Sequence, residues 1–138
     1  MRAKHLIVAV EDDLVDAITL KRAFRDAEIR DTLVLTTNGE EALAFLQTDE
    51  HERPLFLLLD LNAPRMSGLE FLRIIKADEC LRRIPIVVLT TSNQEQDKRQ
   101  MFDLSIAGYL VKPMDYDQFV QMIKTVYAYW TINALPSE

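Results

Sequence analysis

The stretch Leu55-Phe56-Leu57-Leu58-Leu59-Asp60 is an unbroken apolar run that ends in a carboxylate. A run of this kind belongs in a protein interior, and the segment that follows it, residues 61–68, contains both a proline and a glycine that end regular structure. A charge at the end of a buried run needs a partner, a metal or a chemical role, because burying it alone costs much free energy. Asp60 is therefore the first candidate for a functional residue.

Four further apolar runs of similar length lie along the chain, and none of them alternates cleanly between apolar and polar residues. This pattern is typical of strands that are covered on both faces. The five expected strands are Leu6–Val10, Thr32–Thr36, Leu55–Leu59, Ile86–Leu89 and Tyr109–Val111. The segments between and after them carry apolar residues at helical spacing. These helical stripes run over residues 14–27, 42–46, 69–75, 101–104 and 119–130.

Strands and helices that alternate in this way predict an α/β fold with a parallel sheet, because parallel neighbours need crossover connections. We expect a doubly wound (βα)5 sandwich of the flavodoxin-like type with strand order 2-1-3-4-5. In such sheets ligands bind beyond the carboxyl ends of the strands, where the strand order reverses. The polar residues that follow each strand therefore carry the functional argument.

Composition limits the classes of function. The chain has 138 residues, 49% of them hydrophobic, which is enough for one domain with a real core. A net charge of −6 argues against unaided binding to nucleic acid or to an anionic membrane, since both need a basic surface. The single cysteine, Cys80, excludes an intrachain disulfide, and no segment has the length of a membrane helix. We expect one cytoplasmic domain over residues 1–138, with a core at about 5–132 and no effector domain.

Three acidic residues are expected to converge. Glu11 and Asp12 follow the first strand and Asp60 follows the third, and these strands are neighbours in the order 2-1-3-4-5. Carboxylates about 5 Å apart repel by roughly 3 kcal/mol at an effective dielectric near 20. A divalent cation removes this repulsion, and an all-oxygen site with few protein ligands is typical of Mg²⁺. The backbone carbonyl of Asn62 is a further candidate ligand.

Two more polar residues lie at neighbouring strand ends. Thr90 follows the fourth strand, and Lys112 follows the fifth and brings a positive charge to the pocket. A carboxylate in a cationic pocket can act as a nucleophile toward a phosphoryl group, because phosphoryl transfer needs mainly positioning and charge neutralisation. Asp60 is the best placed nucleophile, with Lys112 and Thr90 as the groups that would meet the transferred phosphoryl oxygens.

At this point the sequence resembles a known family. Val10-Glu11-Asp12, residues 59–68, residues 88–92 and Gly108-Tyr109-Leu110-Val111-Lys112-Pro113 together resemble the CheY-like receiver domain of two-component response regulators. The resemblance covers about residues 5–132. It implies a Mg²⁺-dependent transfer of a phosphoryl group from a histidine kinase to Asp60, with Lys112 on the phosphoryl oxygens. It also implies a cis peptide bond between Lys112 and Pro113, and a switch in which Thr90 moves toward the phosphoryl group while Tyr109 rotates inward.

The resemblance extends to standalone regulators that serve phytochrome-type histidine kinases in bacteria. An output through protein contact is then expected, at a surface formed by the fourth helix, fifth strand and fifth helix. A homodimer is expected through the same three elements, because a second face of the fifth helix, with Tyr116, Tyr127 and Ile132, is expected to be exposed. Transfer to a histidine phosphotransferase, or use as a phosphate sink without a dedicated output, are alternatives that the residues leave open.

Departures from the family pattern bear on the switch and on access to the pocket. Ser105 and Ile106 stand where a small Gly-Ala pair is usual, so Ile106 could crowd the Tyr109 rotation, and Thr91 is bulkier than the residue usual at its position.

Two rival functions remain. A Mg²⁺-dependent phosphohydrolase with an aspartyl nucleophile resembles the haloacid dehalogenase type, but that type needs a second Asp where this chain has Asn62. A receiver-like module that is never phosphorylated predicts a broken pocket, whereas every key position is intact. We therefore expect a switch that phosphorylates and dephosphorylates itself, and not a turnover enzyme.

Overall fold

The computed structural model describes residues 5–48, 50–61 and 67–136, and within them strands and helices alternate as the sequence predicts. The strands are β1 (Leu6–Val10), β2 (Thr32–Thr36), β3 (Phe56–Leu59), β4 (Ile86–Thr90) and β5 (Gly108–Val111). The helices are α1 (Leu14–Asp26), α2 (Gly39–Leu46), α3 (Gly68–Ala77), α4 (Glu95–Asp103) and α5 (Tyr116–Ile132), with a short 3₁₀ turn, η1 (Leu81–Arg83), before β4.

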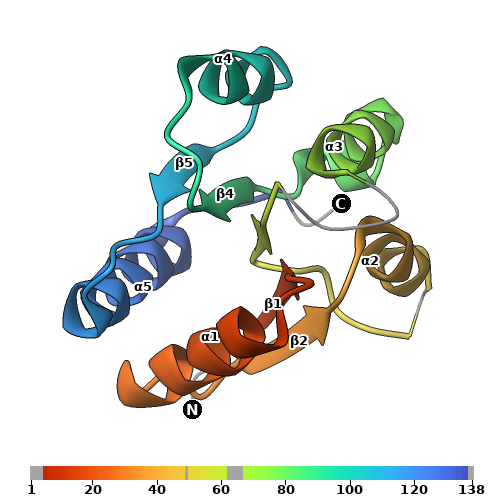
Figure 1. Ribbon diagram of the computed structural model, residues 1–138. Coiled ribbons are helices and arrows are strands. Elements are labelled where there is room, and N and C mark those ends of the chain that lie inside the picture. The colour runs from red at the N-terminus through yellow and green to blue at the C-terminus, as the bar shows by residue number, and fades with distance from the viewer. Residues whose placement is uncertain (1–4, 49, 62–66, 137–138) are drawn as a thin grey trace.

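The five strands form one parallel sheet in the order β2-β1-β3-β4-β5, which confirms the predicted fold class and strand order (Figure 1). β1 lies beside β3, with Val10 paired to Leu59 at the carboxyl end. The hydrogen-bond ladder continues one residue further, because the Asp60 amide donates to the Val10 carbonyl at 3.1 Å and the Glu11 amide donates to the Thr36 carbonyl at 2.9 Å. The residues that follow β1 and β3 are therefore held by backbone bonds.

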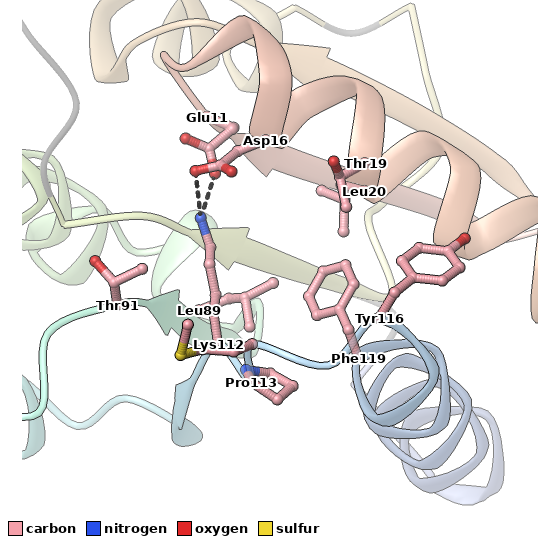
Figure 2. A pocket seen from close by; sticks show the side chains of 11 residues that line it. Glu11, Asp16, Thr19, Leu20, Leu89, Thr91, Lys112, Pro113, Tyr116 and Phe119 are labelled. Carbon is pink, nitrogen blue, oxygen red and sulfur yellow. Dashed lines mark hydrogen bonds and ion pairs between the residues drawn. The ribbon is translucent and has the colours of Figure 1, made fainter.

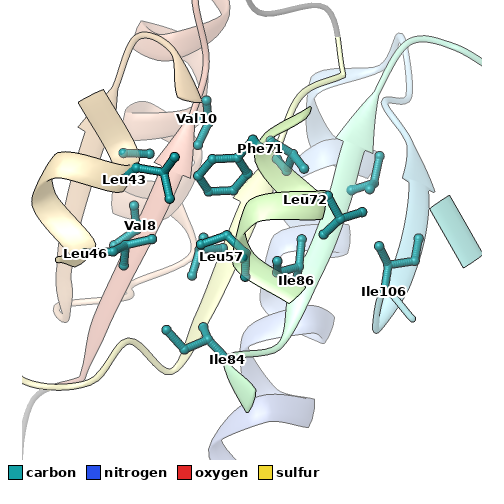
Figure 3. Packing of buried hydrophobic residues seen from close by; sticks show 14 of the residues in the cluster. Val8, Val10, Leu43, Leu46, Leu57, Phe71, Leu72, Ile84, Ile86 and Ile106 are labelled. Atoms are coloured by element: carbon teal, nitrogen blue, oxygen red, sulfur yellow. The ribbon is translucent and has the colours of Figure 1, made fainter. Parts of the chain in front are cut away.

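Helices cover both faces of the sheet, and successive strand residues point to opposite sides. Val8, Val10, Leu57 and Ile86 face α2 and α3, where they pack around Phe71 (Figure 3). The intervening strand residues face α1 and α5. That second cluster contains Ile7, Ala9, Phe56, Leu58, Val87 and Leu89 together with Phe24, Phe119 and Ile123 of the two helices. Burial on both faces explains why the strands read as continuous apolar runs.

Side-chain caps fix where the helices start. Asp13, Asn38, Ser67 and Asp115 each accept a hydrogen bond from a backbone amide in the first turn of the helix that follows, α1, α2, α3 and α5 respectively. Asp13 thus starts α1 directly after the acidic pair Glu11-Asp12. Because these caps follow so closely on the strand ends, the helices begin at the edge of the sheet where the candidate site lies.

Gly68 opens α3 against the residue that follows Asp60. A Cβ atom at Gly68 would lie 3.0 Å from the Cα atom of Leu61, closer than ordinary packing allows. The absence of a side chain at this position therefore lets the start of α3 approach the backbone beside Asp60.

The α4–β5 side is packed more loosely. α4 buries only Met101, and the residues of β5 are half-buried. Ser105, in the connection between them, has a φ of 61°, a left-handed conformation that is uncommon for a residue other than glycine. Ile106 is buried in the cluster against which Tyr109 packs, as expected for a residue that could limit the movement of that ring.

The expectation for the second face of α5 needs a correction. Tyr116 is half-buried and its hydroxyl donates to Asp26 at 2.6 Å, while the hydroxyl of Tyr127 donates to the buried Asp31. Both rings pack against the cluster between the sheet, α1 and α5. Two of the three side chains predicted to be exposed are therefore used within the chain, because α1 and the start of β2 offer carboxylates at the right distance. Ile132 is exposed, as expected.

Over the part of the chain that the structure describes, we find no helix with both the length and the apolar character needed to cross a membrane.

Candidate functional site

Three carboxylates meet at the carboxyl edge of the sheet, where β1 and β3 end. One carboxylate oxygen from each of Glu11, Asp12 and Asp60 can be chosen such that all lie within 4.8 Å of one another. Glu11 and Asp60 are buried and Asp12 is exposed. At this separation two unit charges repel by about 3 kcal/mol at an effective dielectric near 20. The predicted acidic cluster is therefore present, and it needs positive charge.

Lys112 supplies part of that charge from the end of β5. Its backbone amide donates to the Thr90 carbonyl at 2.8 Å, which extends the β4–β5 ladder and fixes the root of the side chain. Its ammonium Nζ donates to Glu11 Oε1 at 2.7 Å, to Asp60 Oδ2 at 3.3 Å and to Asp16 Oδ2 at 3.3 Å (Figure 2 shows the contacts with Glu11 and Asp16). β5 lies two strands away from β3, so a long side chain is needed to reach Asp60.

Burial and pairing shift the pKa values of this group in opposite senses. Burial raises the pKa of Glu11 to about 7, and the neighbouring charge of Asp60 adds to this effect, while Lys112 partly offsets it. Burial alone would lower the pKa of Lys112, but its hydrogen bond with Glu11 and the charges of Asp60, Glu11 and Asp16 together raise that pKa above its ordinary value. Lys112 is therefore a permanent cation at neutral pH.

Thr90 lies beside Asp60, as the sequence predicts, whereas Tyr109 bonds to another residue. Thr90 is fully buried, and its hydroxyl donates to Asp60 Oδ1 at 3.4 Å. Tyr109 lies one strand further along; its hydroxyl donates to the backbone carbonyl of Ser92 at 3.0 Å, and its ring packs against the cluster on the α3 face. The Asp60 carboxylate thus has a hydroxyl donor on one oxygen and an ammonium donor on the other.

The structure contradicts one expectation about the site and leaves another untested. The peptide bond between Lys112 and Pro113 was expected to be cis, but none of the described peptide bonds is cis. That expectation is wrong for this structure: the bond is trans, the form that an X–Pro bond favours by about 0.5–1 kcal/mol without other constraints. The Asn62 backbone carbonyl, expected to bind the metal, lies outside the described residues.

Asp16 is a member of the site that sequence reasoning missed. It lies in the first turn of α1, half-exposed, and is the third carboxylate on the Lys112 ammonium. An acidic residue in the first turn of a helix is ordinary, because it interacts favourably with the positive end of the helix dipole. The available signal was its position: the strand ends at Val10, Asp13 caps the helix, and Asp16 therefore falls one turn beyond the acidic pair.

The residues present fit a divalent cation. All three clustered ligands offer carboxylate oxygens, two of them buried, and hard cations such as Mg²⁺ prefer oxygen ligands. Glu11 also accepts a hydrogen bond from the Asp13 amide at 3.3 Å, which orients its carboxylate. Glu11, Asp12 and Asp60 would hold the ion, and exposed Asp12 leaves the site open to water on one side.

A cleft opens beside the charged cluster, between α1 and α5. Glu11, Asp16 and Lys112 lie at one end of it, and Tyr116 and Phe119 at the other (Figure 2). Its volume is about 280 Å³. The cleft is therefore mostly apolar and ends at the ammonium group that contacts Asp60.

Residues 7–124 match the family of response regulator receiver domains, and the chain belongs to this family. It is 36% identical over 129 residues to the response regulator Rcp1 of Synechocystis sp. strain PCC 6803, covering 91% of this chain and 88% of Rcp1. The crystal structure of the phosphorylated cyanobacterial phytochrome response regulator RcpA has a TM-score of 0.89 and 35% identity, covering 98% of this chain and 100% of RcpA.

A metal-containing relative is also known. The crystal structure of the Mn²⁺-bound form of Rcp1 has a TM-score of 0.84 and 34% identity, covering 96% of this chain and 99% of that one. The protein is thus a receiver domain, homologous to response regulators of phytochrome signalling, with the acidic cluster that a divalent metal requires.

Proposed function

We propose that this protein is a single-domain response regulator that accepts a phosphoryl group from a histidine kinase on Asp60 in a Mg²⁺-dependent reaction. The observation that carries the proposal is the environment of the Asp60 carboxylate. It is buried, bonded to Thr90 through Oδ1 and to Lys112 through Oδ2, and clustered with Glu11 and Asp12. Membership of the receiver family supports the same reading.

The chemistry follows from these contacts. An Asp60 carboxylate oxygen attacks the phosphorus of a phosphohistidine, the P–N bond breaks, and the imidazole leaves with a proton from solvent while an acyl phosphate forms on Asp60. Lys112 and Thr90 then hydrogen-bond the phosphoryl oxygens, which stabilises the charge of the transferred group. Bound Mg²⁺ supplies the further positive charge that three carboxylates and a phosphoryl group require.

The proposed switch depends on Thr90, which contacts Asp60, and on Tyr109, one strand further along. The aspartyl phosphate carries about −1.5 to −2 charge in place of the single charge of the carboxylate, next to the Thr90 hydroxyl, and this favours movement of that donor toward the new oxygens. Tyr109 is half-buried and tied to Ser92, so a shift at the end of β4 reaches it directly. The output surface we propose is α4–β5–α5. In this account the protein is a switch and not a turnover enzyme.

A kinase has to reach the pocket to deliver the phosphoryl group, and exposed apolar side chains lie on two of the segments that contribute residues to it. Leu14, Val15 and Ile18 are exposed on the first turns of α1, and Met114 is exposed just after Pro113. Exposed apolar residues grouped around a polar site are typical of a surface for a protein partner. We propose a phytochrome-type histidine kinase, in line with the named relatives, and a cytoplasmic location, where such a kinase has access to ATP.

The extent of the domain and the oligomeric state stay predictions. We propose that residues 1–138 work as one receiver domain and that the α4–β5–α5 surface forms a homodimer, since Phe102, Tyr129 and Ile132 are exposed there. Relay to a histidine phosphotransferase is the second candidate output.

Labelling with a phosphodonor and Mg²⁺ tests the phosphoacceptor. We expect one phosphoryl group per chain, stable to acid and labile to hydroxylamine, as an acyl phosphate is. Asp60→Asn should abolish the labelling, and chelation of Mg²⁺ should suppress it. The matched control is Asp103→Asn, which changes an exposed carboxylate of α4 in the same way.

Full labelling of the Asp60→Asn chain would overturn the assignment. Continuous release of phosphate from many substrate molecules per chain would instead favour the phosphohydrolase.

A further inference from the structure

We propose that Asp16 is a positioning residue for the phosphotransfer reaction and that it acts through the ammonium group of Lys112. The proposal rests on the function proposed above and deepens it. It starts from the third carboxylate that the Lys112 ammonium contacts, one that belongs to neither the acidic cluster nor the reacting group.

The number of N–H donors on the Lys112 ammonium equals the number of carboxylates that it contacts. A lysine ammonium has three N–H donors and no acceptor. Lys112 Nζ contacts three carboxylates, at 2.7 Å from Glu11, 3.3 Å from Asp60 and 3.3 Å from Asp16. Three acceptors restrict the position of the nitrogen more than two would, because each additional contact removes a direction in which it can move. Asp16 therefore completes the placement of the ammonium.

The three carboxylates differ in what the reaction does to them. Asp60 becomes an acyl phosphate, so its contact with Lys112 must change. Glu11 belongs to the oxygen cluster that suits a divalent cation, so a bound metal competes for its carboxylate. Asp16 is not one of the three residues of that cluster. Its contact with Lys112 is the one that can persist through the reaction and keep the ammonium aimed at the phosphoryl oxygens.

The two residues come from opposite sides of the site. Asp16 lies in the first turn of α1, a helix that Asp13 caps and whose inner face is buried. Lys112 follows β5, on the side of the sheet with the half-buried strand. A lysine side chain is flexible and loses much conformational freedom when it is fixed. A bond to a helix that is itself held in place therefore restricts the position of the ammonium group near the acidic cluster.

A small phosphodonor tests the positioning role of Asp16 without a kinase, so an effect on kinase binding cannot change the labelling rate. With acetyl phosphate, an Asp60 oxygen attacks the phosphorus, the bond between phosphorus and the acetyl oxygen breaks, and acetate leaves. We expect Asp16→Ala to slow this labelling by roughly three- to tenfold at saturating Mg²⁺, which is the size of effect usual for coupled neighbours. Asp16→Asn keeps an oxygen acceptor without the charge, so its rate should fall between those of the native protein and Asp16→Ala.

A double-mutant cycle with Lys112→Ala tests whether Asp16 acts through the lysine. In the Lys112→Ala background, Asp16→Ala should have no further effect on the labelling rate. The matched control is Asp117→Asn, which removes an exposed acid from the first turn of α5 and should leave the rate unchanged. Urea unfolding of the same four chains shows whether each variant is folded and whether Asp16 and Lys112 are coupled in stability.

The possible results separate this proposal from the proposed function. If the native chain is not labelled at all, the proposed function fails and this inference fails with it. If the native chain is labelled and Asp16→Ala is labelled as fast or faster, the phosphoacceptor stands and the positioning role is overturned. An equal slowing in both Lys112 backgrounds also overturns it, because Asp16 would then act by another route.

Discussion

The two sides of the molecule bury different numbers of side chains. On one side, α1 buries Leu20, Ala23 and Phe24, and α5 buries Phe119, Val120 and Ile123 against the same face of the sheet. On the other, α4 buries only Met101, and β5 is half-buried along its length. Movement of an element costs less free energy where it buries less apolar surface. The molecule can therefore change at α4 and β5 while α1 and β1 keep the acidic cluster in place.

Hydrogen bonds follow the same division. Tyr116 and Tyr127 tie α5 to carboxylates at the end of α1 and just before β2. On the looser side the Tyr109 hydroxyl donates to a backbone carbonyl, that of Ser92. Bonds to charged acceptors are about twice as strong as neutral ones. The tyrosine expected to move thus has the weaker tether.

A matched pair of phenylalanine substitutions gives the largest expected contrast. Phe119→Ala, on α5, should lower the free energy of unfolding by about 3–5 kcal/mol, because it leaves a cavity in a buried cluster. Phe102→Ala, on α4, removes an exposed ring and should change it by about 0.5 kcal/mol or less. Urea denaturation of both variants measures the difference. Equal losses would show that the two sides are packed alike.

Removing a tyrosine hydroxyl from each side should give a smaller difference in the free energy of unfolding than the phenylalanine pair. Tyr127→Phe leaves the buried Asp31 without that donor and should cost about 1.5–3 kcal/mol of unfolding free energy. Tyr109→Phe loses a bond to a neutral carbonyl and should cost about 0.5–1.5 kcal/mol. Both variants keep the aromatic ring, so the difference between their denaturation midpoints reports the lost hydrogen bonds and not a change in packing. A greater loss at Tyr109 would contradict the assignment of the weaker tether.

Substitution of the exposed apolar residues of the output surface should have the smallest effect on the free energy of unfolding. If this surface forms the proposed homodimer, Ile132→Ser should weaken the dimer in sedimentation velocity and leave the stability of the monomer almost unchanged. Ile74→Ser, at an exposed position on α3, is the control and should not affect association. A native chain that sediments as a monomer both with and without a phosphoryl analogue refutes the proposed dimer.

The sequence was most informative where burial and charge coincide. Asp60, Thr90 and Lys112 follow strands that read as buried, and strand order then brings their side chains together with Glu11. The inference works because the carboxyl ends of parallel strands share one edge. It needs no knowledge of side-chain direction.

Other features depend on contacts that a linear pattern does not contain. Asp16 reads as an ordinary first-turn acid, and only the reach of Lys112 from another strand makes it part of the site. In the sequence, Tyr116 and Tyr127 predict an exposed apolar face. The carboxylates that accept their hydroxyl hydrogen bonds lie about 90 or more residues away in the chain. The Lys112–Pro113 peptide bond is a local choice between two isomers of similar free energy.

The charge of the pocket has a consequence for how this chain can evolve. Glu11, Asp16 and Asp60 contact one ammonium group and Asp12 lies in the acidic cluster beside it, so the native fold gathers four carboxylates close to a single lysine. Natural proteins tolerate unfavourable arrangements where activity requires them, so stability and activity can trade off at the same residues. The site is therefore where selection for reactivity has held stability below what the rest of the sandwich could support.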